Sequence, residues 1–390
     1  MNILYITHTT DGSGARVALA NLAKEMVARG HGVFVFVPRS DCPAADSMRA
    51  AGATVLVAPV CATAYPNTKN PFKWLALLAL RLWKWRRSRR EIRRAIGTYG
   101  IDIVHSNVGP LNLAQPVCRE LGKPHVWHIR EFQEEIDIRF FPQPSLFRQE
   151  IVREGNYNIA ITRAVFEHYA LREGVDRVLY DGVFPAGIAD QELQPFCRRE
   201  KTVLFVGRVE AAKGTLDLIE AFIQFHRTHG DWDLRLVGSY KEDDAYCQAC
   251  RRACETSGCP ENIEFLGKRS DVYALLREAR IVVMPSPCEG FGFVTAEAMA
   301  NGCLVIGRDA GGTKEQMDNG LRLTGGEIAL RFGTREELQA QLCDAAENDH
   351  SDLIGRGRRA AVELYSLERT AGEVEAYYRW IMEDYYDKKS

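Results

Sequence analysis

The sequence predicts an α/β protein with two domains. Short apolar runs that fit buried strands alternate with amphipathic helical stretches, first in one set and then in a second set. The 390 residues also exceed the size at which a single hydrophobic core usually stops growing. With 46% hydrophobic and 26% charged residues, the composition is that of an ordinary globular protein. We therefore expect two successive parallel sheets covered by helices.

Charge, cysteine usage and the first residues narrow the class of protein. A net charge of −2 indicates no general affinity for nucleic acid. Met1 runs directly into an expected strand, so we expect no signal peptide, and no apolar run approaches the ~20 residues that cross a bilayer. Eleven cysteines, scattered through the elements, indicate reduced thiols. These features together predict a cytoplasmic protein.

The first domain is expected at residues 1–183. Its strands are predicted at residues 2–7, 33–37, 101–105, 125–131, 158–161 and 177–180, and its helices include residues 15–29 and 111–121. Parallel strands bind ligands at their carboxyl ends, so polar residues at those ends are site candidates. His128 lies near such an end, with Arg130 and Glu131 as weaker candidates. A lone histidine is more often a structural hydrogen-bonding group, but the position of His128 favours ligand contact.

Gly12 and Gly14 follow the first strand and suggest a dinucleotide-binding fingerprint. That interpretation fails, because the third glycine of the pattern would fall on Val17. The second strand also ends in Pro38-Arg39, where an acidic residue should hold a ribose. The remaining interpretation is that this loop lets the backbone approach an anionic ligand at a helix N-terminus.

Residues 72–94 are unusually basic. They carry a net charge of +8, which leaves −10 for the rest of the chain out of a total of −2. The apolar residues among them are Phe72, Leu75, Leu78, Leu82, Trp83 and Trp85. Basic residues with tryptophan and leucine anchors are typical of a helix that lies on an anionic membrane surface. The alternative is an ordinary amphipathic helix with a basic solvated face.

An interdomain linker is expected at residues 184–200, and the second domain at 184–368. Its strands are predicted at residues 202–208, 234–238, 262–267, 281–284 and 304–306, a capping box at 334–337, and a last helix from Ser366. Residues 369–390 of that helix are expected to pack back on the first domain. Arg208 ends the first of these strands and Lys213 begins the next helix. Two cations at such a junction predict a diphosphate site.

The stretch from Pro285 to Gly302 combines a glycine-bearing turn with a helix predicted at residues 293–300. Glu289 lies in the turn and Glu297 in the helix, with seven residues between them. The turn also carries Gly290, Phe291 and Gly292, whose amides lie at the N-terminus of that helix. Carboxylates beside bare amides suit a polyhydroxylated ligand, whereas a single glutamate there would be an ordinary surface charge.

Cys247, Cys250, Cys254 and Cys259 suggest a metal site. Three of them have the spacing of a packed helix face, and a free cysteine behaves as a small hydrophobic residue. Zinc sites more often use two separated Cys-x-x-Cys pairs. We therefore favour packing and expect no metal.

These motifs together resemble retaining GT-B glycosyltransferases, the glycosyl transferases group 1 or family four. The resemblance covers nearly the whole chain and is strongest from Val203 to Glu315. It rests on Glu289-Gly-Phe-Gly with Glu297, on Gly207-Arg208 with Lys213-Gly214, and on Gly311-Gly-Thr-Lys-Glu315. Tyr180-Asp-Gly-Val183 also resembles the family's Tyr-Asn-Gly-Val turn, with Asp181 in place of Asn. The implied fold is GT-B: two Rossmann-like domains that face each other across a cleft.

The resemblance implies transfer of a sugar, with retained configuration, from a nucleoside-diphosphate sugar to a hydroxyl. The implied catalytic residues are Glu289, His128, Arg208 and Lys213, and the implied donor-binding residues are Gly12, Gly14, Arg208, Lys213, Glu289, Gly290, Phe291, Gly292 and Glu297. Of these, Arg208 and Lys213 would bind the diphosphate, and Glu297 would bind the ribose. No cofactor or metal is implied, because the cations do what a metal does elsewhere.

The partners implied are a nucleotide-sugar donor and a saccharide or lipid-linked acceptor. Residues 72–94 add a possible anionic membrane surface, which would make the protein cytoplasmic or peripheral on the inner face of the plasma membrane. The expected context is bacterial polysaccharide or glycolipid assembly. The alternatives are a non-catalytic nucleotide-sugar-binding subunit of a transferase complex and a phosphorylase-like enzyme. For the phosphorylase-like alternative, the sequence shows no cofactor-lysine motif.

Overall fold

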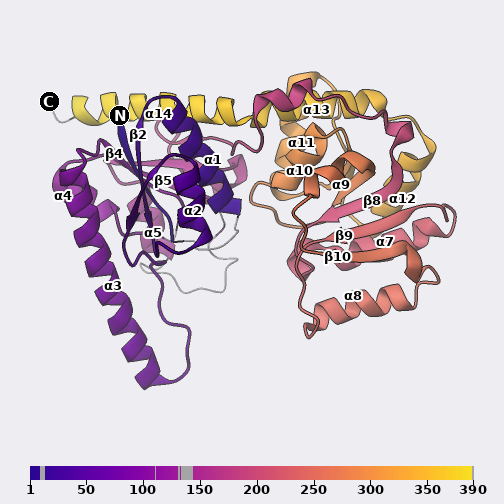
Figure 1. Cartoon of the computed structure of the whole chain (residues 1–390), viewed down its shortest axis with the longest axis horizontal. Coiled ribbons are helices and arrows are strands. Elements are labelled where there is room, and N and C mark those ends of the chain that lie inside the picture. Colours follow the sequence, from indigo (N-terminus) through magenta and orange to yellow (C-terminus); the bar gives the residue numbers. More distant parts are fainter. Residues whose placement is uncertain (9–13, 110, 131, 133–143, 389–390) are drawn as a thin grey trace. The chain divides into compact units, whose positions relative to one another are not determined.

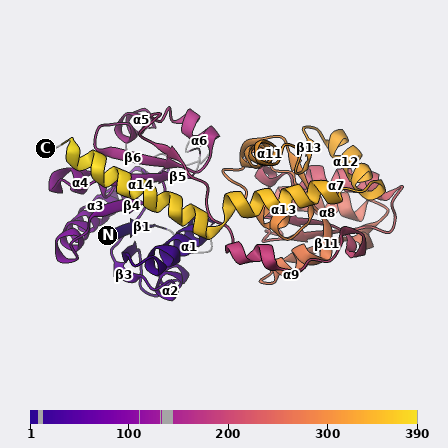
Figure 2. The ribbon, with the colours of Figure 1, turned by 90° about the horizontal axis from the view of Figure 1, so that it is seen from above.

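The computed structural model describes residues 1–8, 14–109, 111–130, 132 and 144–388. The chain forms two compact units, each with its own parallel sheet (Figures 1 and 2). Unit 1 comprises residues 1–182 and 367–390, and unit 2 comprises residues 183–366. The chain therefore crosses between them twice, and the second crossing returns the last helix to unit 1.

The sheet of unit 1 has seven parallel strands in the order β3-β2-β1-β4-β5-β6-β7. Their bounds are β1 Asn2–Ile6, β2 Gly32–Val37, β3 Thr54–Val57, β4 Ile103–Ser106, β5 His125–Ile129, β6 Asn156–Ala160 and β7 Arg177–Val178. The helices are α1 Gly14–Ala28, α2 Pro43–Ala50, α3 Pro71–Thr98, α4 Gln115–Leu121, α5 Pro144–Ile151, α6 Arg163–His168 and α14 Leu367–Asp387. This strand order is that of a doubly wound fold, as predicted.

Several expected bounds in unit 1 were wrong, and two of them illustrate why. The strand predicted to reach residue 131 ends at Ile129. The helix predicted from Leu111 begins only at Gln115, where Pro116 occupies the first helical turn. Proline fits the first turn because its missing N–H would have no partner there. The sequence analysis also missed β3, an edge strand whose residues are only partly buried or exposed.

The sheet of unit 2 has six parallel strands in the order β10-β9-β8-β11-β12-β13. Their bounds are β8 Glu200–Val206, β9 Asp233–Val237, β10 Ile263–Gly267, β11 Ala279–Met284, β12 Leu304–Arg308 and β13 Leu330–Phe332. The helices are α7 Thr215–His226, α8 Ala245–Glu255, α9 Val272–Glu278, α10 Phe293–Ala300, α11 Gly311–Thr324, α12 Arg335–Glu347 and α13 Ser351–Tyr365. The capping box predicted at Thr334 and Glu337 is present at the start of α12.

The cysteines of α8 and Cys259 after it are buried. Cys250, Cys254 and Cys259 belong to the hydrophobic core of unit 2. Burial raises the pKa of Cys250 to about 12 and that of Cys254 to about 11, so both remain thiols. Among the residues that the structure describes, no group of three His, Cys, Asp or Glu side chains is placed to hold a metal ion. The described helices also include none that is long and apolar enough to cross a membrane.

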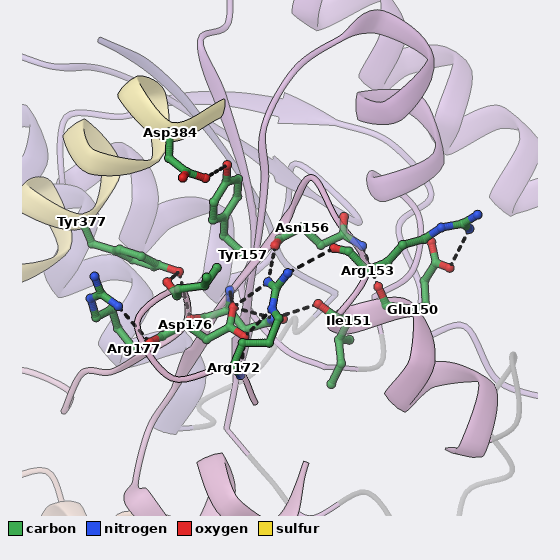
Figure 3. Close-up of polar contacts among 12 residues, drawn as sticks. Glu150, Ile151, Arg153, Asn156, Tyr157, Arg172, Asp176, Arg177, Tyr377 and Asp384 are labelled. Atoms are coloured by element: carbon green, nitrogen blue, oxygen red, sulfur yellow. Dashed lines mark hydrogen bonds and ion pairs between the residues drawn. The ribbon is translucent and has the colours of Figure 1, made fainter. Parts of the chain in front are cut away.

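Helix α14 is held on unit 1 by apolar packing and by a polar network (Figure 3). The large apolar and aromatic residues of α14 that are buried are Val374, Tyr377, Tyr378, Ile381 and Tyr385. The Tyr377 hydroxyl donates toward the carbonyls of Asn158 and Val175, at 3.2 and 3.0 Å. The Tyr157 hydroxyl donates to Asp384 at 2.9 Å. These bonds anchor α14 to the segments around β6 and β7.

The network is centred on Asp176, whose side chain is completely buried. Its carboxylate accepts from the backbone N–H and the guanidinium of Arg172, at 2.9 to 3.0 Å. It also accepts from the backbone and side-chain N–H groups of Asn158, both at 2.9 Å. A buried carboxylate with this many donors is compensated for its loss of water.

We predict that Asp176→Asn lowers the free energy of unfolding by about 2 kcal/mol or more, because it leaves the Arg172 guanidinium without its counter-charge. The matched control is Asp46→Asn, which removes the exposed partner of Arg49 and should cost less than about 0.5 kcal/mol. Urea denaturation of both variants measures the difference. Equal losses in the two variants would contradict the role given to Asp176.

Candidate functional site

The predicted donor-binding residues of unit 2 lie on two turns and on α10, which carries Glu297, and the Gly311-Gly-Thr motif lies at a third turn. These turns follow β8, β11 and β12, which are neighbours in the order β8-β11-β12. The carboxyl ends of parallel strands share an edge, and ligands of open α/β sheets bind at that edge. The topology therefore brings the segments around residues 208, 289 and 311 to the same edge of the sheet.

Gly214 allows the turn after β8 to contact the turn after β11. It has a positive φ of 66°, and a Cβ atom there would lie 2.4 Å from the carbonyl oxygen of Pro285. The Ser286 hydroxyl also donates to the carbonyl of Ala212 at 2.9 Å. No residue with a side chain fits at position 214 without displacing this backbone. The contact places the neighbouring Lys213 beside Glu289.

Gly311 allows the turn after β12 to contact the same segment from the other side. Its φ is 55°, and a Cβ atom there would lie 2.8 Å from both the backbone N and O of Glu289. The N–H of Gly312 donates to the carbonyl of Glu289 at 2.8 Å. The Gln316 side chain donates to the carbonyls of Phe291 and Gly292, at 2.6 and 2.9 Å. The backbone that carries Glu289 is thus held by bonds from α11.

Lys213 and Glu289 form an ion pair, with 2.6 Å between Lys213 Nζ and Glu289 Oε1. Both side chains are partly exposed, so the pair remains open to a ligand. Arg208, by contrast, is 68% exposed and contacts Glu210 at 3.0 Å. The turn after β8 thus carries Lys213, whose ammonium is paired with Glu289, and Arg208, whose side chain is more exposed.

Gly292 precedes α10, in a left-handed conformation with φ 86° and without a side-chain cap. The predicted residues Gly290 and Phe291 lie in the turn before it. The Phe291 ring is buried against Phe293 and Tyr365, so only its backbone is a plausible ligand contact. The start of α10 thus combines a positive dipole end with glycine backbone.

Glu297 lies on α10 and is partly buried. Tyr273, on α9, donates its hydroxyl to Glu297 Oε1 at 3.3 Å. Burial raises the pKa of Glu297 above its ordinary value, and the hydrogen bond from Tyr273 lowers it by less. Sequence reasoning missed Tyr273, because no motif spacing connects α9 to α10. The tyrosine hydroxyl thus orients one oxygen of the Glu297 carboxylate.

In unit 1, His128 lies on β5 and is almost fully buried. Its ring packs edge-on against that of His105, and it lines a cavity of about 10 Å³, enough for about one water molecule. Burial, and secondarily the positive charge of Arg130, hold the pKa of His128 well below its ordinary value. The expected sugar contact is not tested by this arrangement. The side chain lies deeper than its strand-end position suggested.

Arg130 explains the tautomer of His128. Its Nη2 lies 3.1 Å from His128 Nδ1, and a guanidinium can only donate. Nδ1 is therefore the acceptor, and the proton of the neutral ring is on Nε2. That atom is buried without a partner among the described residues. His128 is thereby preset as a neutral hydrogen-bond donor.

Arg130 was a weak candidate for acceptor contact, and the structure gives it another environment. Its guanidinium forms a buried ion pair with Asp181 and donates to the carbonyl of Asn107 at 3.1 Å. Asp181 stands where the resembled family has Asn, so the added negative charge is matched by Arg130. Gly14 is the exposed first residue of α1. Gly12 and Glu131 lie outside the described residues.

Another pocket in unit 1, of about 380 Å³, contains none of the predicted site residues. It lies at the amino ends of β5 and β6, and its lining includes Lys123, His125, Asn156 and Tyr385. The opposite edge of a parallel sheet usually binds the ligand. We therefore do not assign the donor to this pocket.

Comparison with solved structures identifies the fold. A glycosyltransferase from Rickettsia africae ESF-5 superposes with a TM-score of 0.78 at 18% identity, over 98% of each chain. Anabaena Alr3699/HepE, solved in complex with UDP, gives a TM-score of 0.75 at 18% identity, over 96% of this chain and 99% of that one. The chain has the GT-B glycosyltransferase fold, as predicted.

Sequence comparison identifies the family. Residues 13–181 match the "Glycosyl transferase 4-like domain" family, and residues 200–348 match "Glycosyl transferases group 1". A curated relative, the lipopolysaccharide core biosynthesis mannosyltransferase LpcC of Rhizobium leguminosarum bv. viciae, is 28% identical over 228 residues. That alignment covers 56% of this chain and 61% of the relative, so it spans less than two thirds of the relative's length. The chain belongs to the group 1 glycosyltransferases.

We predict that Glu297→Gln stabilises the protein at neutral pH. A raised pKa means that the folded state binds the proton more tightly than the unfolded state does. The stability contributed by the protonated carboxyl is therefore full below the ordinary value of about 4.3, and it is lost as pH rises through the folded pKa. Glutamine keeps the acceptor for Tyr273 without the buried charge.

Thermal unfolding at pH 5 and pH 8 tests this prediction. The melting temperature of Glu297→Gln should exceed that of the wild type by about 2 °C or more at pH 8, and by less at pH 5. The control is Glu264→Gln, on the exposed part of β10. A lower melting temperature for Glu297→Gln than for the wild type at pH 8 would contradict the prediction that the ionised Glu297 carboxylate destabilises the folded protein.

Proposed function

We propose that this protein is a retaining, metal-independent glycosyltransferase. It transfers a glycosyl group from a nucleoside-diphosphate sugar to a hydroxyl acceptor. Family membership supports glycosyl transfer. The structural observation that best supports the proposal is the Lys213–Glu289 ion pair. Turns that require glycine hold this pair at the carboxyl edge of the unit 2 sheet. An ammonium for a phosphate and a carboxylate for a sugar hydroxyl stand side by side there.

The proposed chemistry is stabilisation of the leaving group. The bond from the anomeric carbon to the diphosphate breaks, and negative charge develops on the diphosphate oxygens. Lys213 and Arg208 would neutralise that charge. The acceptor oxygen bonds to the anomeric carbon from the same face, which retains configuration, and its proton passes to the departing diphosphate. We assign no nucleophile to Glu289, which positions the sugar through its hydroxyls.

The remaining predicted residues have supporting roles. The amides of Gly290, Phe291 and Gly292 would bind the donor at the start of α10, and Glu297, oriented by Tyr273, would hold the ribose hydroxyls. His128, as a neutral donor, would contact the sugar from unit 1. Gly12 and Gly14 would let the backbone approach the phosphates. We further propose that two protein cations make a divalent metal unnecessary for turnover.

The proposed acceptor is a saccharide or lipid-linked saccharide of the bacterial envelope, with the enzyme on the cytoplasmic side. The lipopolysaccharide relative LpcC supports this context. An anionic membrane surface contacted through residues 72–94 would bring the enzyme to such an acceptor. The donor base and sugar are proposed only as a class, a nucleoside diphosphate sugar. The UDP complex of the Anabaena neighbour makes UDP the first candidate to test.

We predict that Lys213→Ala and Arg208→Ala each lower turnover of the nucleotide sugar by about two to three orders of magnitude, because each removes charge stabilisation of the leaving group. The control, Lys201→Ala, removes a cation that pairs with Asp231 at the surface of the same unit. It should leave turnover within about twofold. Release of nucleoside diphosphate, with and without a chelator, is the measurement.

Wild-type turnover in Lys213→Ala would overturn the diphosphate role. Loss of wild-type turnover in chelator would overturn metal independence. Nucleotide-sugar binding without turnover, with acceptors of several classes, would instead identify an accessory subunit.

We also predict that Gly311→Ala weakens donor binding about tenfold or more, because its Cβ would displace the backbone of Glu289. The matched control is Gly258→Ala. Gly258 also has a positive φ, of 81°, but a Cβ there would meet nothing within 4 Å. Both variants carry backbone strain, and only Gly311→Ala disturbs the site. Titration calorimetry with UDP, GDP, ADP and TDP distinguishes them, and equal affinities would contradict the proposal.

A further inference from the structure

Helix α3 buries only its second half. Its buried residues are Trp85, Ser88, Ile92, Ala95 and Ile96, and all but Ser88 pack in the hydrophobic core on one face of the unit 1 sheet. The first half extends beyond the sheet (Figure 1). There Phe72 is 83% exposed, Leu75 59% and Trp83 52%. Contacts with the loop before the helix, such as the stacking of Tyr65 on Trp74, leave this face uncovered.

This exposure is concentrated rather than scattered. In the described part of the chain, eleven large hydrophobic residues are well exposed, and five of them lie between residues 72 and 83. These five are Phe72, Leu75, Leu80, Leu82 and Trp83. Single exposed hydrophobic residues are normal, but a contiguous group marks an interaction surface. Folding of unit 1 therefore does not account for this half of α3.

The same exposed stripe becomes basic in the second half of the helix. At about 100° per residue, Phe72, Ala76 and Trp83 share one side of the helix with Arg86, Arg90 and Arg94. These arginines are exposed and make no ion pair with any residue that the structure describes. Arg93, in contrast, pairs with Glu120. The stripe thus runs from apolar to cationic along one face of one helix.

We propose that this stripe is a membrane-docking face, with anionic phospholipid headgroups as its partner. The partner must be negatively charged over an extended surface and apolar just beneath it, and a bilayer with anionic lipids is both. Phe72, Leu75 and Trp83 enter the boundary between headgroups and acyl chains. Arg86, Arg90 and Arg94 lie in the phosphate layer.

The dimensions of the stripe fit a helix that lies along the surface. From Phe72 to Trp83 the helix rises about 16 Å, and from Arg86 to Arg94 about 12 Å. Lys73 is exposed near the start of the helix, so deep end-on insertion would bury a cation. Shallow docking leaves that ammonium among the headgroups. This inference concerns a surface of unit 1 and stands independently of the proposed donor site.

Vesicle binding of the full-length protein tests the inference. The probes are vesicles of phosphatidylcholine alone and vesicles with about one third phosphatidylglycerol. The first variant is Arg86→Ser/Arg90→Ser/Arg94→Ser. At about fivefold for each basic residue near an anionic surface, it should weaken binding to the anionic vesicles roughly a hundredfold. Its control is Arg198→Ser/Arg227→Ser/Arg252→Ser, which removes the same charge from exposed positions of unit 2 and should bind as the wild type does.

The second variant is Phe72→Ser/Leu75→Ser/Trp83→Ser, which should weaken binding at least tenfold without changing the net charge. Its control, Leu121→Ser/Tyr386→Ser, removes exposed hydrophobic residues elsewhere on unit 1 and should bind normally. Circular dichroism and soluble-acceptor turnover confirm that each variant is folded. Unchanged vesicle binding by either α3 variant would overturn the inference. A wild-type dimer that dissociates in the Phe72/Leu75/Trp83 variant would overturn it in favour of a contact between two copies.

Discussion

The candidate site depends on backbone packed against backbone without intervening side chains. The turn after β11 carries Glu289, and it is contacted by the turn after β8 on one side and by the start of α11 on the other. At Gly214 and Gly311 a Cβ atom would lie within 3 Å of the backbone of that turn. Both glycines also have a positive φ, so two independent constraints select glycine there. A cation and a carboxylate from segments 76 residues apart are brought within 2.6 Å as a result.

The electrostatics of the site favour ligand binding over stability. In the ligand-free protein Lys213 and Glu289 neutralise each other, so neither cation nor carboxylate is buried alone. Glu297 has no such counter-charge among the residues that the structure describes; the hydroxyl of Tyr273 bonds it there, and burial raises its pKa. Ionised Glu297 therefore lowers the stability of the ligand-free protein, and hydrogen bonds from the hydroxyl groups of a ligand would offset that loss. The Asp176 network of unit 1 is the opposite case, because every donor around it serves the fold.

Features set by neighbouring residues could be predicted from the sequence, whereas contacts between segments far apart in the chain could not. Apolar periodicity, glycine and proline act locally, so the strand at 281–284 and the helix at 293–300 were placed almost to the residue. Short edge strands such as β3 and β13 lack a long apolar run and were missed. Tyr273, which bonds Glu297, and Arg130, which pairs with Asp181, were not assigned these partners. Those pairs join distant segments, and no spacing in the chain encodes them. The burial of His128 could not be read from the sequence for the same reason, because its neighbours come from other strands.

A crystal structure of the protein with a bound nucleoside diphosphate sugar tests the central claim most directly. The account predicts diphosphate oxygens within hydrogen-bond distance of Lys213 and Arg208. It also predicts that the Lys213–Glu289 contact is exchanged for a contact between Glu289 and a sugar hydroxyl. A nucleotide bound elsewhere, or bound at this edge with the Lys213–Glu289 ion pair intact and the diphosphate out of reach, would contradict it.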